Sequence, residues 1–181
     1  MNSFCTKVPS IAILMVLILS LVGCGTPPKN PAEFRAMAKE GGFFLSNDSY
    51  VVKRPFQQVV DTYRQKAPTC LNQTITTTSW QQQGQFRTKT TSTRIWKAKV
   101  AATGNHMECT LQSRSPDANN IEVYDPPNKD GHYFMLVDAY PVDQNSTRIV
   151  LSKAIGTSDV LIQATRNWAT GESMGCPDMT Q

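Results

Sequence analysis

Apolar side chains recur at helical spacing in the segment that follows Pro55. They stand at positions i, i+3, i+4, i+7 and i+11 of that segment: Phe56, Val59, Val60, Tyr63 and Ala67. This spacing puts them on one side of an α-helix, while the other side is polar. We expect the helix to begin at Pro55 and to stop at Pro68, because proline suits the first helical turn and disrupts later ones. A strand is predicted just before it, over Tyr50 to Lys53.

The chain from Gln73 to Thr103 is rich in threonine and has no helical period, which favours strands. A break at Gly84 predicts a turn within it. Further on, Trp96, Ala98 and Val100 alternate with lysines, as in a strand with one buried face. Gly104 and Asn105 then fit a two-residue hairpin turn into an antiparallel strand over residues 106–113.

The last part of the chain predicts two more strands and a closing helix. The run HYFMLVDAY at residues 132–140 predicts a buried strand, and residues 147–154 predict its neighbour. Residues 114–131 look like a loop around a short strand at 121–124. Thr157 and Ser158 are expected to cap a helix that ends at Gly171. One side of this helix is apolar: Val160, Leu161, Ala164 and Trp168.

Together these elements predict an α+β domain: a strand, a helix, a meander of about five or six strands and a closing helix. This order, with the pattern around Val51-Val52, Pro55-Phe56 and Val59, resembles the helix-grip fold of the START and SRPBCC proteins. The resemblance covers about residues 48–170. It implies a curved antiparallel sheet packed on the C-terminal helix.

The same resemblance implies a cleft for a lipid or small hydrophobic ligand between the sheet and the closing helix. Aromatic residues such as Trp80, Phe134 and Tyr140 are available for an apolar pocket, although in a domain of this size such residues are as a rule part of the core. The residues expected to line the cleft are Trp96, Tyr133, Met135, Leu161 and Trp168.

The N-terminus has the pattern of a signal peptide. Ile11 to Val22 form a run of twelve residues in which Ser20 is the only polar one, and Lys7 precedes it. A membrane-spanning helix needs about twenty apolar residues, so this run is too short for a stable anchor. We expect the leader to be cleaved.

Leu21-Val22-Gly23-Cys24 resembles the lipobox of bacterial lipoproteins at every position. That family implies a lipid on the Cys24 thiol and cleavage just before it. We therefore predict a lipoprotein signal peptide at residues 1–23, a lipidated tether with a short helix at 24–47, and one domain at 48–181. Acyl chains on Cys24 would anchor the protein to the membrane. Because Gly25, not aspartate, follows Cys24, the family pattern implies the outer membrane, facing the periplasm.

Three cysteines remain once Cys5 leaves with the leader and Cys24 carries the lipid. An exported protein can form disulfides, and three thiols allow one bridge with one thiol left over. Cys109 alternates with Met107 and Leu111, so we expect it to be a buried free thiol. Cys70 and Cys176 follow or end helices, and we predict that they pair.

Charge is unevenly distributed along the chain. Residues 53–114 carry ten basic and two acidic side chains, whereas residues 115–145 carry six acids and one lysine. This asymmetry fits a basic surface for anionic lipid or an acidic partner, or simply a solvated strand face. Nucleic acid is not expected as a partner in a periplasmic location. With 40% apolar residues in 181, the chain fits one globular domain and excludes collagen-like, coiled-coil and highly charged disordered classes.

The chain lacks the short motifs of common enzymes. His106 and His132 are its only histidines, and no nucleophile elbow, phosphate-binding glycine loop or zinc motif is present. We expect no enzyme activity and no catalytic residue, metal or cofactor. Asp138 lies within an apolar strand pattern and is either solvent-facing or a buried, paired carboxylate. The sequence favours a non-catalytic accessory or scaffold lipoprotein that binds other envelope proteins, with binding of a lipid or hydrophobic ligand as the alternative.

Overall fold

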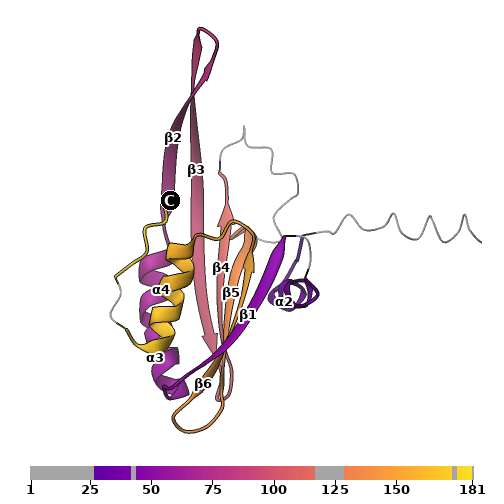
Figure 1. Cartoon of the computed structure of the whole chain (residues 1–181), viewed down its shortest axis with the longest axis vertical. Helices are drawn as coiled ribbons and strands as arrows, with labels where there is room; N and C mark the ends of the chain where they lie inside the picture. Colours follow the sequence, from indigo (N-terminus) through magenta and orange to yellow (C-terminus); the bar gives the residue numbers. More distant parts are fainter. Residues whose placement is uncertain (1–26, 42–43, 117–128, 173–174, 181) are drawn as a thin grey trace, which may run out of the picture.

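The computed structural model describes residues 27–41, 44–116, 129–172 and 175–180. The signal peptide, Cys24 and the short strand predicted at 121–124 lie outside these residues. The described part is an α+β domain of three helices and six strands (Figure 1). In chain order the elements are α2 (Pro31–Lys39), β1 (Leu45–Val52), α3 (Phe56–Leu71), β2 (Thr74–Gln83), β3 (Phe86–Ala102), β4 (Met107–Arg114), β5 (His132–Pro141), β6 (Thr147–Ala154) and α4 (Asp159–Thr170).

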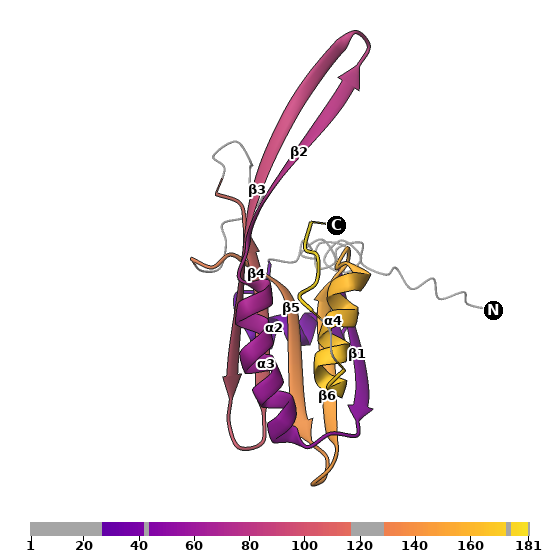
Figure 2. The ribbon, with the colours of Figure 1, turned by 90° about the vertical axis from the view of Figure 1, so that its left-hand side faces the viewer.

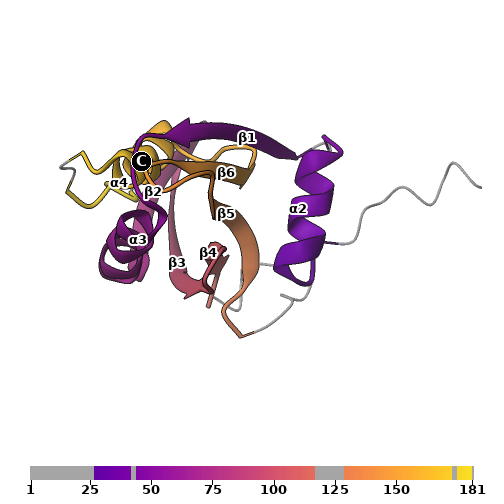
Figure 3. The ribbon, with the colours of Figure 1, turned by 90° about the horizontal axis from the view of Figure 1, so that it is seen from below.

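The strands form a single antiparallel sheet in the order β1-β6-β5-β4-β3-β2. Strands β2 to β6 follow one another as a meander, and β1 joins the far side of β6. The sheet curls into a half-barrel, and α4 packs on it together with α3 (Figure 3). The predicted fold class, a helix-grip-like curved sheet on a C-terminal helix, is confirmed.

The hydrophobic core lies between the concave face of the sheet and the two helices α3 and α4. The apolar side chains predicted on one side of α3 are buried there, with Val59, Tyr63 and Ala67 almost fully enclosed. Alternate residues of β4, among them Cys109, point into the core from the sheet and face the two helices. Burial of this apolar surface is the main stabilising contribution to the domain.

Helix α3 continues past Pro68 to Leu71, so the predicted stop at Pro68 is wrong. A proline removes one backbone donor and presses on the carbonyl four residues earlier. Pro68 has no N–H to donate to the Arg64 carbonyl, so α3 loses one helical hydrogen bond but continues for three more residues. The extra turn buries Cys70 and Leu71, and this burial offsets the cost.

The ends of α4 agree with the sequence prediction. The Ser158 hydroxyl accepts a hydrogen bond from the Leu161 backbone N–H at 3.4 Å. Gly171 follows the last turn with a φ of 85°, a left-handed conformation that glycine adopts without strain. Local capping signals therefore define this helix at both ends.

Helix α2 packs on the convex face of the sheet, opposite α3 and α4 (Figure 3). Its N-cap is Asn30, whose Oδ1 accepts from the Glu33 N–H at 2.9 Å. Phe34 and Ala38 point into the sheet and are buried. The neighbouring strand β1 begins at Leu45, earlier than the predicted start at Tyr50.

The β2–β3 hairpin extends well beyond the end of the body (Figure 2). It turns at Gly84, as predicted, where φ is 61°. In the part of the chain that the structure describes, no helix is long and apolar enough to cross a membrane.

Candidate functional site

A cavity lies at the base of the hairpin, where its two strands meet the start of α4. Its volume is about 310 Å³. Apolar side chains from β2, β3, β5, α4 and the C-terminal tail form its walls: Ile75, Trp96, Phe134, Leu161 and Met179. Of the residues predicted to line a cleft, the structure brings Trp96 and Leu161 together here.

The other three predicted cleft residues lie elsewhere. Tyr133 is on the convex face, where its ring centroid is 6.3 Å from that of Phe34 in α2. Met135 and Trp168 are buried in the core, each only 1% exposed. Trp168 packs edge-on against Tyr63, with 5.9 Å between ring centroids. The cavity therefore lies closer to the hairpin than the predicted cleft.

Phe134 reaches the cavity because β5 is irregular at this point. The register between β4 and β5 shifts at Leu111/Gln112, so that Leu111 faces Met135 while Gln112 faces Tyr133. Phe134 is the extra residue, and a bulge of this kind turns a side chain to a new direction. Its ring meets Trp96 edge-on at 4.8 Å between centroids. Simple alternation along the strand places Phe134 on the opposite face, so it cannot predict this contact.

One side of the cavity is polar. Arg94 lies beside Trp96, with its guanidinium carbon 5.9 Å from the ring centroid. Thr77, Ser92 and Ser158 also contribute to the wall. The cavity thus joins an apolar surface to one cation, a combination suited to a small amphipathic molecule. No sequence pattern predicts Arg94, Ile75 and Met179 as part of this site, because only the fold brings them to this place.

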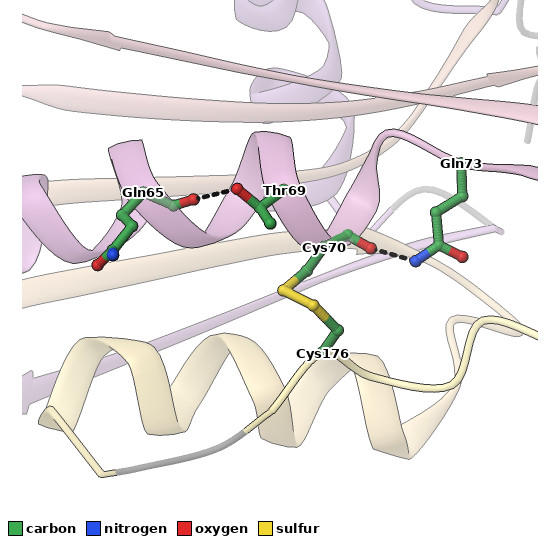
Figure 4. The surroundings of a disulfide bond; sticks show 5 residues. All are labelled: Gln65, Thr69, Cys70, Gln73 and Cys176. Atoms are coloured by element: carbon green, nitrogen blue, oxygen red, sulfur yellow. Dashed lines mark hydrogen bonds between the residues drawn. A yellow bond between two sulfur atoms is a disulfide. The ribbon is translucent and has the colours of Figure 1, made fainter.

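The tail that carries Met179 is held by a disulfide. Cys176 and Cys70 are bonded, with 4.9 Å between their Cα atoms (Figure 4). This is the predicted pair. Gln73 donates a side-chain hydrogen bond to the Cys70 carbonyl next to it. The bond joins the end of α3 to the tail after α4, and the tail then reaches the cavity wall.

Cys109 is the buried free thiol that the strand pattern predicts. It lies on the concave face of β4 and is 1% exposed. Burial raises the pKa of the Cys109 thiol to about 12, and the nearby carboxylates Asp138 and Glu108 add to this shift. A neutral, enclosed thiol is a poor nucleophile, so this residue belongs to the core.

The upper part of the hairpin is exposed on both faces. Phe86 and Trp80 are its largest apolar side chains, at 79% and 63% exposed. Lys89 lies opposite Trp80 in the ladder, and its Nζ is 5.9 Å from the ring centroid. Aromatic side chains are enriched at the cores of protein interfaces relative to the rest of the surface. The sequence signal for this surface is the run of threonine and glutamine, which leaves neither face of the hairpin apolar enough to be buried.

A charged cluster lies on the convex face, under α2. Asp138 is 1% exposed and receives hydrogen bonds from Arg35 and from His106. Arg35 also contacts Glu108. The hydrogen bond to Asp138 is the main reason why the pKa of Arg35 lies above its ordinary value. Of the two alternatives that the sequence left for Asp138, the structure shows the buried, paired carboxylate.

This cluster has an architectural role. Its basic and acidic groups pair with one another, and the Tyr140 ring stacks on His106 at 4.8 Å between centroids. Among the described residues, no three His, Cys, Asp or Glu side chains are arranged to hold a metal ion. The cluster therefore joins α2 to β4 and β5.

Comparison of the sequence with protein-family models and with curated proteins finds no match. The functional interpretation therefore rests on the hairpin and on the cavity at its base.

Proposed function

We propose that this chain is a non-catalytic lipoprotein of the cell envelope that binds other envelope proteins as an accessory or scaffold component. The observation that carries the proposal is the projecting hairpin. It holds Trp80 and Phe86 in solvent beside a cationic strand, away from the body. Exposing large aromatic side chains is unfavourable in water, and a partner that covers them gains from their burial.

The anchor in this proposal is the lipid on Cys24, at the outer membrane and facing the periplasm. The lipobox sequence Leu21-Val22-Gly23-Cys24 supports it. A polar, proline-containing tether follows and leads into α2. Since α2 is packed on the sheet, the tether joins the body on the convex face.

Photo-crosslinking in living cells tests this function. A benzophenone amino acid in place of Phe86 should give one or a few discrete adducts, which mass spectrometry should identify as envelope proteins. The matched control replaces Val142, which is 56% exposed in the turn between β5 and β6 at the other end of the body. Equal crosslinking from both positions, or adducts only with abundant unrelated proteins, would contradict the proposal.

The cavity supports a second candidate function, binding of a lipid or small hydrophobic ligand. Its aromatic walls and Arg94 fit an apolar molecule with an anionic group. Native mass spectrometry of the purified protein should then show a bound molecule of fixed mass. The variant Thr77→Trp, which fills the cavity from an exposed wall position, should lose it. Wild-type protein that is always free of added mass would argue against this function.

A further inference from the structure

Strand β2 forms an unprotected edge of the sheet. In the described part of the chain its only neighbouring strand is β3, and ten successive residues pair with β3 without a bulge. The segment Thr74–Gln83 contains no charged residue, proline or glycine. Proteins usually protect an edge strand with charge, proline or a bulge, because free backbone groups attract another strand. None of these devices is present on β2.

The hydrogen-bond pattern shows which backbone groups point outward. The Gln73 carbonyl accepts from the Trp96 N–H at 2.8 Å, so odd-numbered residues of β2 bond to β3. The backbone groups of Thr76, Thr78 and Trp80 therefore point away from β3. In agreement, the hydroxyl oxygens of Thr76 and Thr93 are 3.3 Å apart, as expected for a pair without backbone bonds between them.

The charge on the hairpin indicates what kind of strand fits this edge. Residues 62–107 contain no Asp or Glu, and β3 places Arg87 and Lys89 next to β2. A second copy of this chain would bring the same cations together and be repelled. An acidic strand would instead meet complementary charge, and its apolar side chains could pack on Trp80.

We propose that the β2 edge accepts an extended acidic segment of a partner protein as an additional strand of the sheet. This inference rests on the proposed function and names how the partner is bound. Backbone hydrogen bonds to Thr76, Thr78 and Trp80 provide the attachment. The cations of β3 provide the preference for acidic segments.

A designed peptide is the probe for this site. A fluorescent ten-residue peptide of alternating Val and Glu should bind the full chain, purified in mild detergent, as measured by anisotropy. The same peptide with Lys in place of Glu should bind at least tenfold more weakly. A Val–Glu peptide with every backbone nitrogen methylated should show the same loss, because it has no backbone hydrogen-bond donor on either edge. Equal binding of all three peptides would overturn the proposal.

The variant Thr78→Pro tests the edge itself. It removes an outward N–H and leaves the bonds to β3 in place, so proline is tolerated at this position. Binding of the Val–Glu peptide should fall at least tenfold, whereas the control Thr78→Val should bind like the wild type. If Thr78→Pro distorts the hairpin, Arg87→Glu/Lys89→Glu gives an independent test. That variant should lose the Val–Glu peptide and gain the Val–Lys peptide, and unchanged preference would overturn the proposal.

Two further results would overturn it. If the wild type does not bind the peptides but forms a dimer, and Thr78→Pro abolishes this dimer, then the β2 edge pairs with a second copy of the chain. If the wild type does not bind the peptides but binds phosphatidylglycerol vesicles, and Arg87→Glu/Lys89→Glu abolishes the vesicle binding, then the hairpin binds a membrane surface. The proposed function is tested separately. If the Phe86 adducts persist in Thr78→Pro, the hairpin binds a partner without strand addition.

Discussion

Arg35 and Asp138 lie 103 residues apart in the chain and meet through two hydrogen bonds on the convex face of the sheet. Arg35 Nε is 2.6 Å from Asp138 Oδ2, and Nη2 is 2.7 Å from Oδ1. This two-pronged geometry is the strongest form of an arginine–carboxylate pair. Because Asp138 is almost fully buried, its charge depends on Arg35 for compensation, and His106 adds a further hydrogen bond. The pair therefore attaches α2 to the sheet.

Arg35→Ala should destabilise the protein by about 3–5 kcal/mol, because it leaves a buried carboxylate without its main partner. Urea denaturation measures this loss of unfolding free energy. The matched control is Arg64→Ala on the exposed side of α3, which should change stability by no more than about 0.5 kcal/mol.

Replacing both partners gives the complementary result. The double variant Arg35→Met/Asp138→Leu removes the buried charge along with its partner, so it should recover most of the stability lost in Arg35→Ala. If Arg35→Ala is as stable as Arg64→Ala, the ion pair contributes nothing and α2 is held by Phe34 and Ala38 alone.

Local signals were sufficient to predict the helices and most strands. Ser158 and Gly171 mark the two ends of α4, and the spacing of Leu161 and Trp168 identifies its buried side. The bounds of β6 also match the prediction. Capping and periodicity depend on neighbouring residues, so a sequence displays them directly.

Features that depend on distant residues could not be predicted in this way. No local pattern relates Arg35 to Asp138, since the fold alone joins them. Phe134 reaches the cavity through a one-residue bulge, which reverses the face that alternation assigns. Likewise, threonine-rich strands are visible in the sequence, but their projection beyond the body depends on how far α3 and α4 cover the sheet.

Trp168 and Trp80 are a matched pair for testing the core. Trp168→Ala should cost about 3–5 kcal/mol, because the side chain is buried against Tyr63. Trp80→Ala should cost no more than about 0.5 kcal/mol, because that ring is exposed. Trp168 Nε1 finds no hydrogen-bond partner among the described residues, so Trp168→Phe should cost less than Trp168→Ala. Denaturant titrations compare the three, and equal losses for Trp168→Ala and Trp80→Ala would contradict this assignment of the core.

The disulfide should contribute strongly to thermal stability. Its cysteines are 106 residues apart, and closing a loop of this length stabilises by up to about 5 kcal/mol in the chain-entropy description. Cys70→Ala/Cys176→Ala should therefore lower Tm by roughly 10 °C in calorimetry. A reducing agent should lower Tm of the wild type and leave the double variant unchanged. Peptide mapping that joins Cys109 to either cysteine would contradict the pairing.

Membrane attachment should depend on Cys24. The variant Cys24→Ser lacks the thiol that takes the lipid, so it should accumulate as an uncleaved or soluble form. Cys5→Ser, which changes a cysteine within the leader, should leave processing and attachment intact. Fractionation of cells with immunodetection distinguishes these forms. A Cys24→Ser protein that is still processed and membrane-bound would refute the lipoprotein assignment.

The decrease in the free energy of unfolding at alkaline pH should depend in part on Cys109. Burial raises the pKa of its thiol from 9.0 to about 12 in the native state. Between these values the thiol ionises in the unfolded chain but remains neutral in the native protein. The contribution of the Cys109 thiol to the free energy of unfolding is therefore fully present below pH 9 and is lost as the pH rises toward 12. This group lowers the stability by at most about 1.4 kcal/mol per pH unit.

Urea titrations between pH 8 and pH 10.5 test this dependence by comparing slopes. Cys109→Ala should show a flatter loss of stability with pH than the wild type, even though its absolute stability is lower. Tyr63 and Tyr50, whose pKa values burial also raises, remain in both proteins and provide the common background. In the native wild type at pH 8, iodoacetamide should label Cys109 only after unfolding. Rapid labelling of the native protein, or identical slopes for both proteins, would show that the thiol is accessible to water and that β4 does not turn Cys109 into the core.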